Sequence, residues 1–324
     1  MGLPTHFKLN SGHLIPAVGL GTWQSKPNEV ELAVEHSLRA GYRHIDAAAI
    51  YGNEKEVGRG IKKSGVARED IFITSKLWNN NHRPENVEPA LDQTLADLQI
   101  DYLDLYLIHW PVSFAPGDGN FPRDPKTGRV RLDPEVKNFA GTWAKLEEMV
   151  AKKKVRSIGV SNFNVPLIDE LLTTAKIVPA VNQIEAHPEL QQVALLRYLK
   201  RKGIAATAYS PLGNNNRGLP RVVDDPVVLS IAKKLGKQPA NVLISWSVQR
   251  GVNVVPKSVT PARITANLEV FELSPEDFTA LNHLECHNRL NYLAEGGYDC
   301  FGDTGNDFVL ELAEKEAKAW LAAH

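Results

Sequence analysis

Four residues whose side chains could together move a proton lie at or near the ends of three short apolar runs. Asp46 lies at the end of one run and Tyr51 follows five residues later, while Lys76 and His109 end the next two runs. A lysine ammonium beside a phenol favours the phenolate, so Lys76 should lower the pKa of Tyr51 from its ordinary value of about 10. A tyrosine tuned in this way can donate a proton to a carbonyl oxygen and take it back in the reverse reaction. His109 could orient that carbonyl.

Other catalytic chemistries have less support in the sequence. The chain has no nucleophile elbow and no acidic dyad, and its remaining histidines lack the spacing of metal ligands, so we expect no metal. A proton donor without a nucleophile or a metal indicates that a cofactor supplies a hydride. An aldolase that uses Lys76 to form a Schiff base is an alternative, and borohydride trapping on Lys76 would reveal it.

These four side chains can converge only if the runs that carry them are neighbouring parallel strands. Short apolar, β-rich runs alternate along the chain with amphipathic stretches, a pattern typical of βαβ units around a buried parallel sheet. The predicted strands are 17–21, 44–48, 71–76, 103–109, 157–161, 180–185, 205–210 and 252–256. The predicted helices are 29–40, 54–63, 87–98, 140–152, 166–175, 191–202, 226–235 with 240–249, and 261–270.

Eight such units predict an α/β fold of the (β/α)8 TIM-barrel type rather than an open doubly wound sheet. Residues 7–16 should form an N-terminal β-hairpin that caps the bottom of the barrel, and a C-terminal lid loop and two further helices should follow the last unit. We expect one domain over residues 1–324, of which 274–324 form a C-terminal extension and substrate loop.

The glycines near the first strand could suggest a dinucleotide fingerprint of the Rossmann type. Gly19 and Gly21 have the first spacing of G-x-G-x-x-G, but Gln24 stands where the third glycine belongs. The pattern therefore does not favour a Rossmann domain.

The composition of the chain limits the kinds of partner that the protein can be expected to bind. The 324 residues include 37 Lys and Arg against 38 Asp and Glu, and a net charge of −1 gives no basis for binding nucleic acid. No stretch approaches the ~20 apolar residues of a membrane span, and the N-terminus has no secretory pattern. With two cysteines, a disulfide framework is not expected. We therefore predict a cytoplasmic protein that acts on a small molecule, as a monomer or a dimer.

Three segments resemble the signatures of the aldo-keto reductases. They are 41–54 (GYRHIDAAAIYGNE), 95–111 (with DYLDLYLIHWP) and 255–264 (VPKSVTPARI), and the resemblance runs from about Phe7 to Leu273. It implies a (β/α)8 barrel and NADPH-dependent reduction of a carbonyl compound. The family's catalytic tetrad falls on Asp46, Tyr51, Lys76 and His109. Tyr51 would be the acid, Lys76 and Asp46 would tune it, and His109 would orient the substrate.

The resemblance also implies a set of cofactor contacts along the mouth of the barrel. Tyr209 would stack on the nicotinamide, whose carboxamide would meet Ser161, Asn162 and Gln183. The full cofactor set is Thr22, Trp23, Asp46, Ser161, Asn162, Gln183, Tyr209, Ser210, Leu212, Asn214, Lys257, Ser258, Arg263 and Asn267.

Three of these residues match the family positions that hold an adenosine 2′-phosphate. A dianionic phosphate favours lysine and arginine on charge alone, so Lys257, Ser258 and Arg263 predict NADP(H) rather than NAD(H). Ala266 stands where many members carry a glutamate that contacts adenine, which leaves open how far NADH is accepted.

The predicted substrate pocket has aromatic walls, which suit a small aldehyde or a sugar. Its residues are Trp23, Tyr51, His109, Trp110, Phe114 and Asn291. Arg289, Leu290 and Asn291 resemble the Arg-Phe-Asn start of the lid in fungal and plant aldose reductases, although the sequence then departs from that of xylose reductases. The chain is similar to fungal members that act on glycerol, glyceraldehyde and short polyols, with dihydroxyacetone as a related keto substrate. A xylose or aldose reductase, or a non-catalytic NADP-binding protein of the same fold, is the alternative.

Overall fold

The strands of the central sheet follow one another in space in the order in which they occur along the chain. The computed structural model describes residues 2–26, 28–117, 119–214, 218, 220–293, 299–301 and 306–323. In this part of the chain, eight strands form one parallel sheet in the order β3 to β10. They are β3 (Leu20–Gly21), β4 (His44–Asp46), β5 (Phe72–Leu77), β6 (Leu103–Ile108), β7 (Val155–Ser161), β8 (Val181–Glu185), β9 (Ala205–Tyr209) and β10 (Asn253–Val254).

The first and last strands meet and close the sheet into a barrel. Parallel bridges join Val18 to Val254 and Gly21 to Lys257, and the amide of Gly19 donates to the carbonyl of Val254 at 2.8 Å. The predicted (β/α)8 barrel is therefore confirmed. The predicted first and last strands were longer than β3 and β10, because their outer residues pair only through such isolated bridges.

Glycines permit the close approach at this seam. A Cβ atom on Gly21 would lie 2.7 Å from the carbonyl oxygen of Val255, and one on Gly19 would lie 2.5 Å from Nδ1 of His44. Carbon atoms do not approach so closely without a shift of the neighbour. The glycine pair that resembles part of a dinucleotide fingerprint thus has a packing role in the barrel wall.

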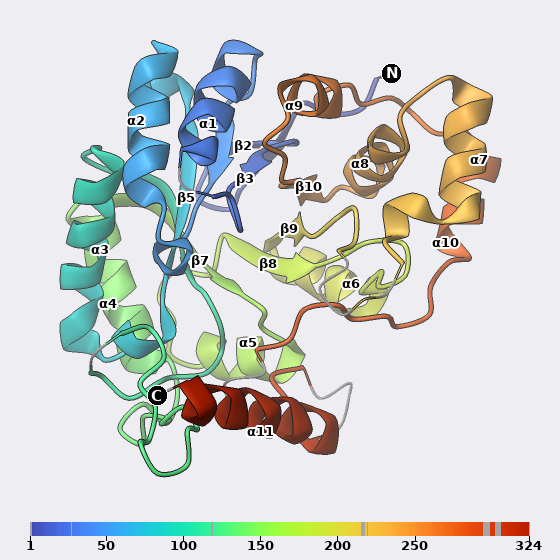
Figure 1. The fold of residues 1–324 in the computed structure, drawn as a ribbon. Helices are drawn as coiled ribbons and strands as arrows, with labels where there is room; N and C mark the ends of the chain where they lie inside the picture. The colour runs from blue at the N-terminus through green and yellow to red at the C-terminus, as the bar shows by residue number, and fades with distance from the viewer. Residues whose placement is uncertain are drawn as a thin grey trace.

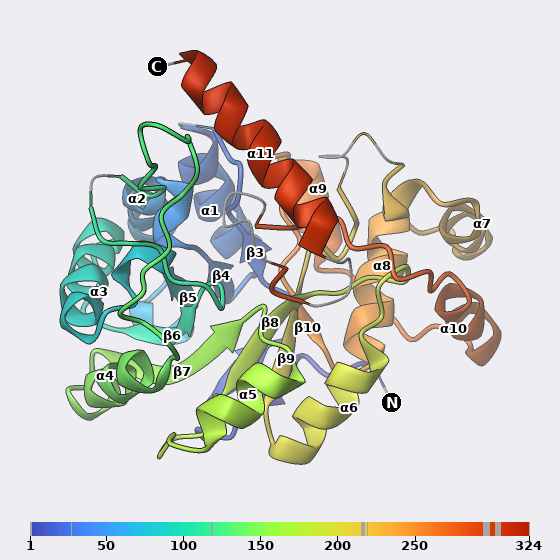
Figure 2. The ribbon, with the colours of Figure 1, turned by 90° about the horizontal axis from the view of Figure 1, so that it is seen from below.

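Helices surround the strands, as Figure 1 and the view along the barrel in Figure 2 show. They are α1 (Glu29–Arg39), α2 (Glu54–Ser64), α3 (Pro84–Leu98), α4 (Ala140–Ala151), α5 (Val165–Leu172), α6 (Val193–Lys202), α7 (Pro226–Leu235), α8 (Pro239–Gln249), α9 (Pro261–Asn267), α10 (Pro275–Asn282) and α11 (Asn306–Ala323). Helix α3 begins three residues before its predicted start because Pro84 is well suited to a first helical turn.

The N-terminal hairpin closes one end of the barrel, as predicted. Strands β1 (His6–Lys8) and β2 (Leu14–Pro16) pair antiparallel. Leu9 and Ile15 are buried in one cluster with Phe72, Leu105 and Leu107, which come from β5 and β6. This packing leaves the carboxyl ends of the strands as the open end.

The last helix lies across the molecule in Figure 2. Ala313 and Ala317 of α11 are buried, and Glu314 forms an ion pair with Arg129 at 2.8 Å. Helix α10 is one of the two further helices predicted after the last unit, and at its start the hydroxyl of Ser274 accepts the amide of Asp277 at 3.1 Å. Residues 294–298 and 302–305 of the expected lid lie outside the described residues. Within the described part, no helix is both long and apolar enough to cross a bilayer.

The interior of the barrel leaves no room for a side chain at Gly159 in β7. A Cβ atom there would lie 2.5 Å from the carbonyl oxygen of Val181 and 2.8 Å from Cδ2 of Leu107. We expect Gly159→Ala to lower the free energy of unfolding by ~1–3 kcal/mol, because the barrel must shift to admit the methyl group. Denaturant unfolding measures this change. Gly2→Ala, at a site with no atom within 4 Å, is the control, and equal stability of both variants would contradict the prediction.

Candidate functional site

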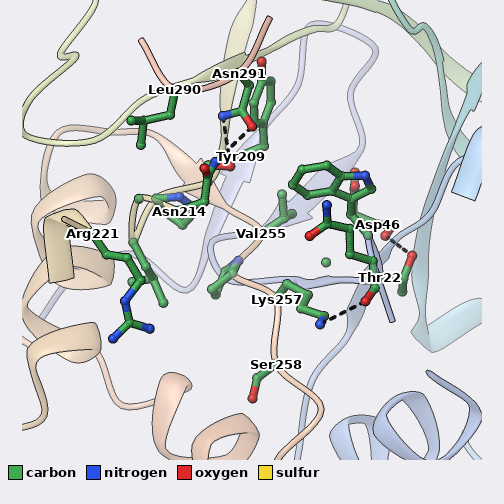
Figure 3. Close-up of a pocket in the computed structure, with 18 of the residues that line it drawn as sticks. Thr22, Asp46, Tyr209, Asn214, Arg221, Val255, Lys257, Ser258, Leu290 and Asn291 are labelled. Atoms are coloured by element: carbon green, nitrogen blue, oxygen red, sulfur yellow. Dashed lines mark hydrogen bonds between the residues drawn. The ribbon is translucent and has the colours of Figure 1, made fainter. Parts of the chain in front are cut away.

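A cavity of about 1130 Å³ opens at the carboxyl ends of the strands, where barrel enzymes have their active sites. Figure 3 shows Lys257 and Ser258 toward one end of it and Leu290 and Asn291 toward the other. Most of the predicted site residues line it. They are Thr22, Trp23, Asp46, Tyr51, His109, Trp110, Ser161, Asn162, Gln183, Tyr209, Ser210, Leu212, Asn214, Lys257, Ser258, Arg263, Asn267 and Asn291.

A buried ion pair lies at the floor of this cavity. Asp46 pairs with Thr74 across β4 and β5, and Lys76 follows two residues later on the same face of β5 because strand side chains alternate. The ammonium of Lys76 donates to Oδ1 of Asp46 at 2.6 Å and to the carbonyl of Ala47 at 2.9 Å. The two side chains are 1% and 4% exposed. The pair therefore fixes the ammonium of Lys76 as a positive centre beneath the cavity.

Tyr51 is the group that this positive centre meets. It ends a short 3-10 turn, Ala49–Tyr51, that follows β4, and Gly52 with φ of 67° terminates the turn. The ammonium of Lys76 lies 3.4 Å from the phenolic oxygen of Tyr51. The predicted convergence of Asp46, Tyr51 and Lys76 is thus present.

The predicted direction of the pKa of Tyr51 is wrong for the protein without a ligand. Burial raises the pKa of Tyr51 above its ordinary value, and the charge of Lys76 offsets only part of that effect. Burial also opposes the ammonium of Lys76, but Asp46 and Tyr51 outweigh it and leave the pKa of Lys76 raised. The site therefore holds a neutral phenol beside a stable cation.

His109 completes the floor as a neutral imidazole. Burial, together with the charge of Lys76, lowers the pKa of His109 well below its ordinary value. The ring packs edge-on against Tyr51 at 5.9 Å and against Trp78 at 5.2 Å between centroids. Nδ1 of His109 is buried and has no hydrogen-bond partner among the described residues. A neutral imidazole in this position can orient a polar ligand atom.

A hydrogen-bonded group of side chains continues from the floor toward β7, β8 and β9. The amide of Gln183 donates to Oδ2 of Asp46 at 2.7 Å, and the hydroxyl of Tyr209 donates to Oδ1 of Asn162 at 2.7 Å. Ser161 donates to the carbonyl of Gln183 at 2.9 Å. The predicted carboxamide set thus lies beside the predicted proton donor, on adjacent strands.

The opposite end of the cavity carries positive charge. Lys257 and Arg263 are exposed there, and among the described residues neither makes an ion pair within 4.0 Å. By contrast, Arg221 on the same cavity wall pairs with Asp224 at 2.8 Å. Lys257 and Arg263 therefore keep their charge available to an anionic ligand.

Several aromatic and apolar residues on the wall were absent from the predicted set. Trp78, Phe121, Ile50 and Leu293 line the cavity. Trp78 comes two residues after Lys76, and this position at a strand end was the signal that could have identified it. Phe121 and Leu293 come from loops, which strand periodicity does not place.

Phe114 and Lys76 are the predicted site residues that are not on the cavity wall. Phe114 is 1% exposed and packs edge-on against Trp78 with ring centroids 6.0 Å apart. Phe114 therefore packs behind the wall, in one buried cluster with Trp78 and Trp110. Lys76 lies below the wall and reaches the cavity through Tyr51.

Comparisons with known proteins agree with this architecture. Residues 17–285 match the sequence model of the Aldo/keto reductase family. The chain is 52% identical over 287 residues to D/L-glyceraldehyde reductase of Hypocrea jecorina, with 85% of this chain and 86% of that protein covered. It is 49% identical over 288 residues to aldo-keto reductase family 1 member A1 of Pongo abelii, with 85% and 88% covered.

A solved structure gives the same result for the fold. The aldose reductase from Schistosoma japonicum superposes with a TM-score of 0.86 at 42% identity and covers 92% of this chain, which in turn covers 98% of that structure. With a family match over most of its length and relatives near half identity, the chain belongs to the aldo/keto reductase family of oxidoreductases.

Proposed function

We propose that this protein reduces small aldehydes and aldoses, and short keto compounds such as dihydroxyacetone, to alcohols with NADPH, with Tyr51 as the general acid. One observation carries the proposal. The ammonium of Lys76 lies 2.6 Å from Asp46 and 3.4 Å from the hydroxyl of Tyr51 at the floor of the cavity. The similarity to D/L-glyceraldehyde reductase of Hypocrea jecorina supports the substrate class.

Tyr51 would move the proton. Because burial raises the pKa of Tyr51, the hydroxyl is protonated at neutral pH and can donate to a carbonyl oxygen as negative charge develops there. The resulting phenolate would lie beside the ammonium of Lys76, whose positive charge stabilises it. Asp46 keeps that ammonium in place.

His109 would orient the carbonyl oxygen without competing for the proton. Its lowered pKa keeps the imidazole neutral, so Lys76 remains the cation at the floor. Among the described residues, Nδ1 of His109 has no hydrogen-bond partner.

The residues along the cavity fit an NADP cofactor. Asn162 and Gln183 are buried amides that suit a carboxamide, Tyr209 offers a ring face, and Lys257 with Arg263 supplies positive charge at the far end. When bound, NADPH would supply the hydride for reduction of the carbonyl carbon. The remaining residues of the predicted cofactor set also line this cavity.

The preference for NADPH rests on charge. A 2′-phosphate dianion gains charge-assisted hydrogen bonds from Lys257, Ser258 and Arg263, whereas the 2′-hydroxyl of NADH does not. Ala266 and Asn267 line the same end, and Ala266 offers no carboxylate to adenine, so recognition here depends chiefly on the phosphate.

The substrate end would admit small aldehydes. Trp23, Trp78, Trp110 and Phe121 form its aromatic wall, and polar contacts come from Tyr51, His109 and Asn291. A xylose or aldose reductase is the alternative within the same chemistry, and the similarity to the Schistosoma aldose reductase favours it. Relative kcat/KM for glyceraldehyde, dihydroxyacetone and xylose distinguishes the two.

Replacing the proposed acid tests the mechanism. We expect Tyr51→Phe to reduce kcat for glyceraldehyde reduction by ~10²–10⁴-fold, because the phenyl ring cannot donate the proton. Loss of nicotinamide absorbance measures the rate, and quenching of protein fluorescence by NADPH checks that the cofactor still binds. Normal turnover by this variant, or no turnover of any short aldehyde by the wild type, would refute the proposal.

The cation site predicts cofactor choice. We expect Lys257→Met to raise KM for NADPH by roughly tenfold and to leave KM for NADH within about twofold, because only NADPH loses a charge-assisted contact. Lys62→Met controls for a general change in net charge, because Lys62 is also exposed and makes no ion pair within the described part of the chain. Equal losses with NADPH and NADH would show that the phosphate assignment is wrong.

The raised pKa of Tyr51 predicts opposite pH trends for the two directions. Reduction needs the phenol, so its rate should stay level through pH 7–9 and fall only near the raised pKa, above about 10. Oxidation of the alcohol needs the phenolate, so its rate should still be rising at pH 9. Initial rates from pH 6 to pH 10 with both substrates measure this. A plateau in oxidation near pH 7 would contradict a raised pKa.

A further inference from the structure

Glu185, the last residue of β8, is a fully buried carboxylate outside the proposed proton machinery. Its side chain is 0% exposed, and it stands opposite Tyr209 in the register of β8 and β9. A buried carboxylate is destabilising unless hydrogen bonds replace its lost hydration. The partners of Glu185 therefore indicate what it holds.

Two of those partners belong to a later segment that lines the cavity. Oε1 of Glu185 accepts the backbone amide of Leu290 at 2.9 Å, and Oε2 accepts that of Asn291 at 3.0 Å. The third partner is His187, whose Nε2 lies 2.9 Å from Oε1. We call residues Leu290–Leu293 the strap, and Leu290, Asn291 and Leu293 all line the cavity.

The strap in turn holds the loop that follows β9. The side-chain amide of Asn291 donates to the hydroxyl of Ser210 at 3.3 Å. The side-chain amide of Asn214 donates to Oδ1 of Asn291 at 3.0 Å (Figure 3). Ser210 and Asn214 belong to the predicted cofactor set. A continuous chain of hydrogen bonds thus runs from Glu185 through the backbone and side chain of Asn291 to the cofactor wall.

We infer that Glu185 is a positioning residue that sets how fast the dinucleotide leaves. The inference rests on the proposed NADPH site. The strap and residues 210–214 both line the cavity in which the dinucleotide would lie, and motions of segments beside a bound ligand often limit product release. Glu185 keeps the strap down, and Asn291 transmits that restraint to the loop. Neither residue has to touch the reacting atoms.

Because Glu185 and Asn291 lie on one path of hydrogen bonds, the inference makes a specific prediction for a double-variant cycle. Glu185→Gln loses an acceptor for one strap amide and should raise the dissociation rate of NADPH about tenfold, because a hydrogen bond to a charged group is lost. Asn291→Ala cuts the side-chain link and should raise it roughly fivefold. Since both changes break one path, the double variant should release NADPH about as fast as the faster single variant.

The measurement is stopped-flow displacement of NADPH from the full-length protein, followed by nicotinamide fluorescence. Glu189→Gln is the matched control, because the carboxylate of Glu189 accepts the side-chain amide of Asn288 at 2.6 Å just before the strap, whereas the backbone amides of Leu290 and Asn291 donate to Glu185. We expect it to change the rate by less than about twofold, since its partner lies outside the path.

Three results would overturn the inference. They are a double variant whose rate increase is the product of the two single increases, a Glu189→Gln variant as fast as Glu185→Gln, and an unchanged rate in Asn291→Ala. An unchanged NADPH dissociation rate in Asn291→Ala overturns the inference even if Glu185→Gln unfolds at a lower temperature than the wild type. A wild-type protein that does not bind NADPH would instead contradict the proposed function, so the two failures are distinguishable.

Discussion

The site depends on one buried ion pair. Removing an ammonium and a carboxylate from water costs several kcal/mol for each ion, and their attraction compensates only when the geometry is good and the other hydrogen-bonding positions are filled. Lys76 meets this condition with Asp46, the carbonyl of Ala47 and Tyr51, and Asp46 meets it with Lys76 and Gln183. Such a pair adds little to stability, and its value here is a cation that cannot move away from Tyr51.

The barrel makes that pair possible. Asp46 and Lys76 come from adjacent strands whose register brings their side chains to the same face, and Gly21 allows the seam beside them to close against Val255. The hairpin fills the opposite end through Leu9 and Ile15. Ligand access is thereby directed to the carboxyl ends of the strands, where neutral His109 and the buried amides form one end of the cavity and the exposed cations form the other.

The strap shows the same principle applied to a second buried charge. Glu185 is satisfied mainly by backbone amides of a segment about a hundred residues further along the chain. The hydrogen bonds that this buried carboxylate requires thus hold that segment at the cavity wall. Acidic residues at strand ends therefore hold both parts of the site. Asp46 acts at the proposed proton donor, and Glu185 acts at the proposed cofactor wall.

The sequence by itself determined the closed barrel, the hairpin, and the three strand ends that carry Asp46, Lys76 and His109, because periodicity and strand-end position are local properties. It also indicated the cations Lys257 and Arg263. Only the tertiary structure decided the direction of the pKa of Tyr51, since burial depends on every wall of the cavity at once. Only the tertiary structure, likewise, shows that Phe114 packs against Trp78 and that Phe121 and Leu293 line the cavity. Those side chains come from loops whose course is set by long-range packing, which no local pattern records.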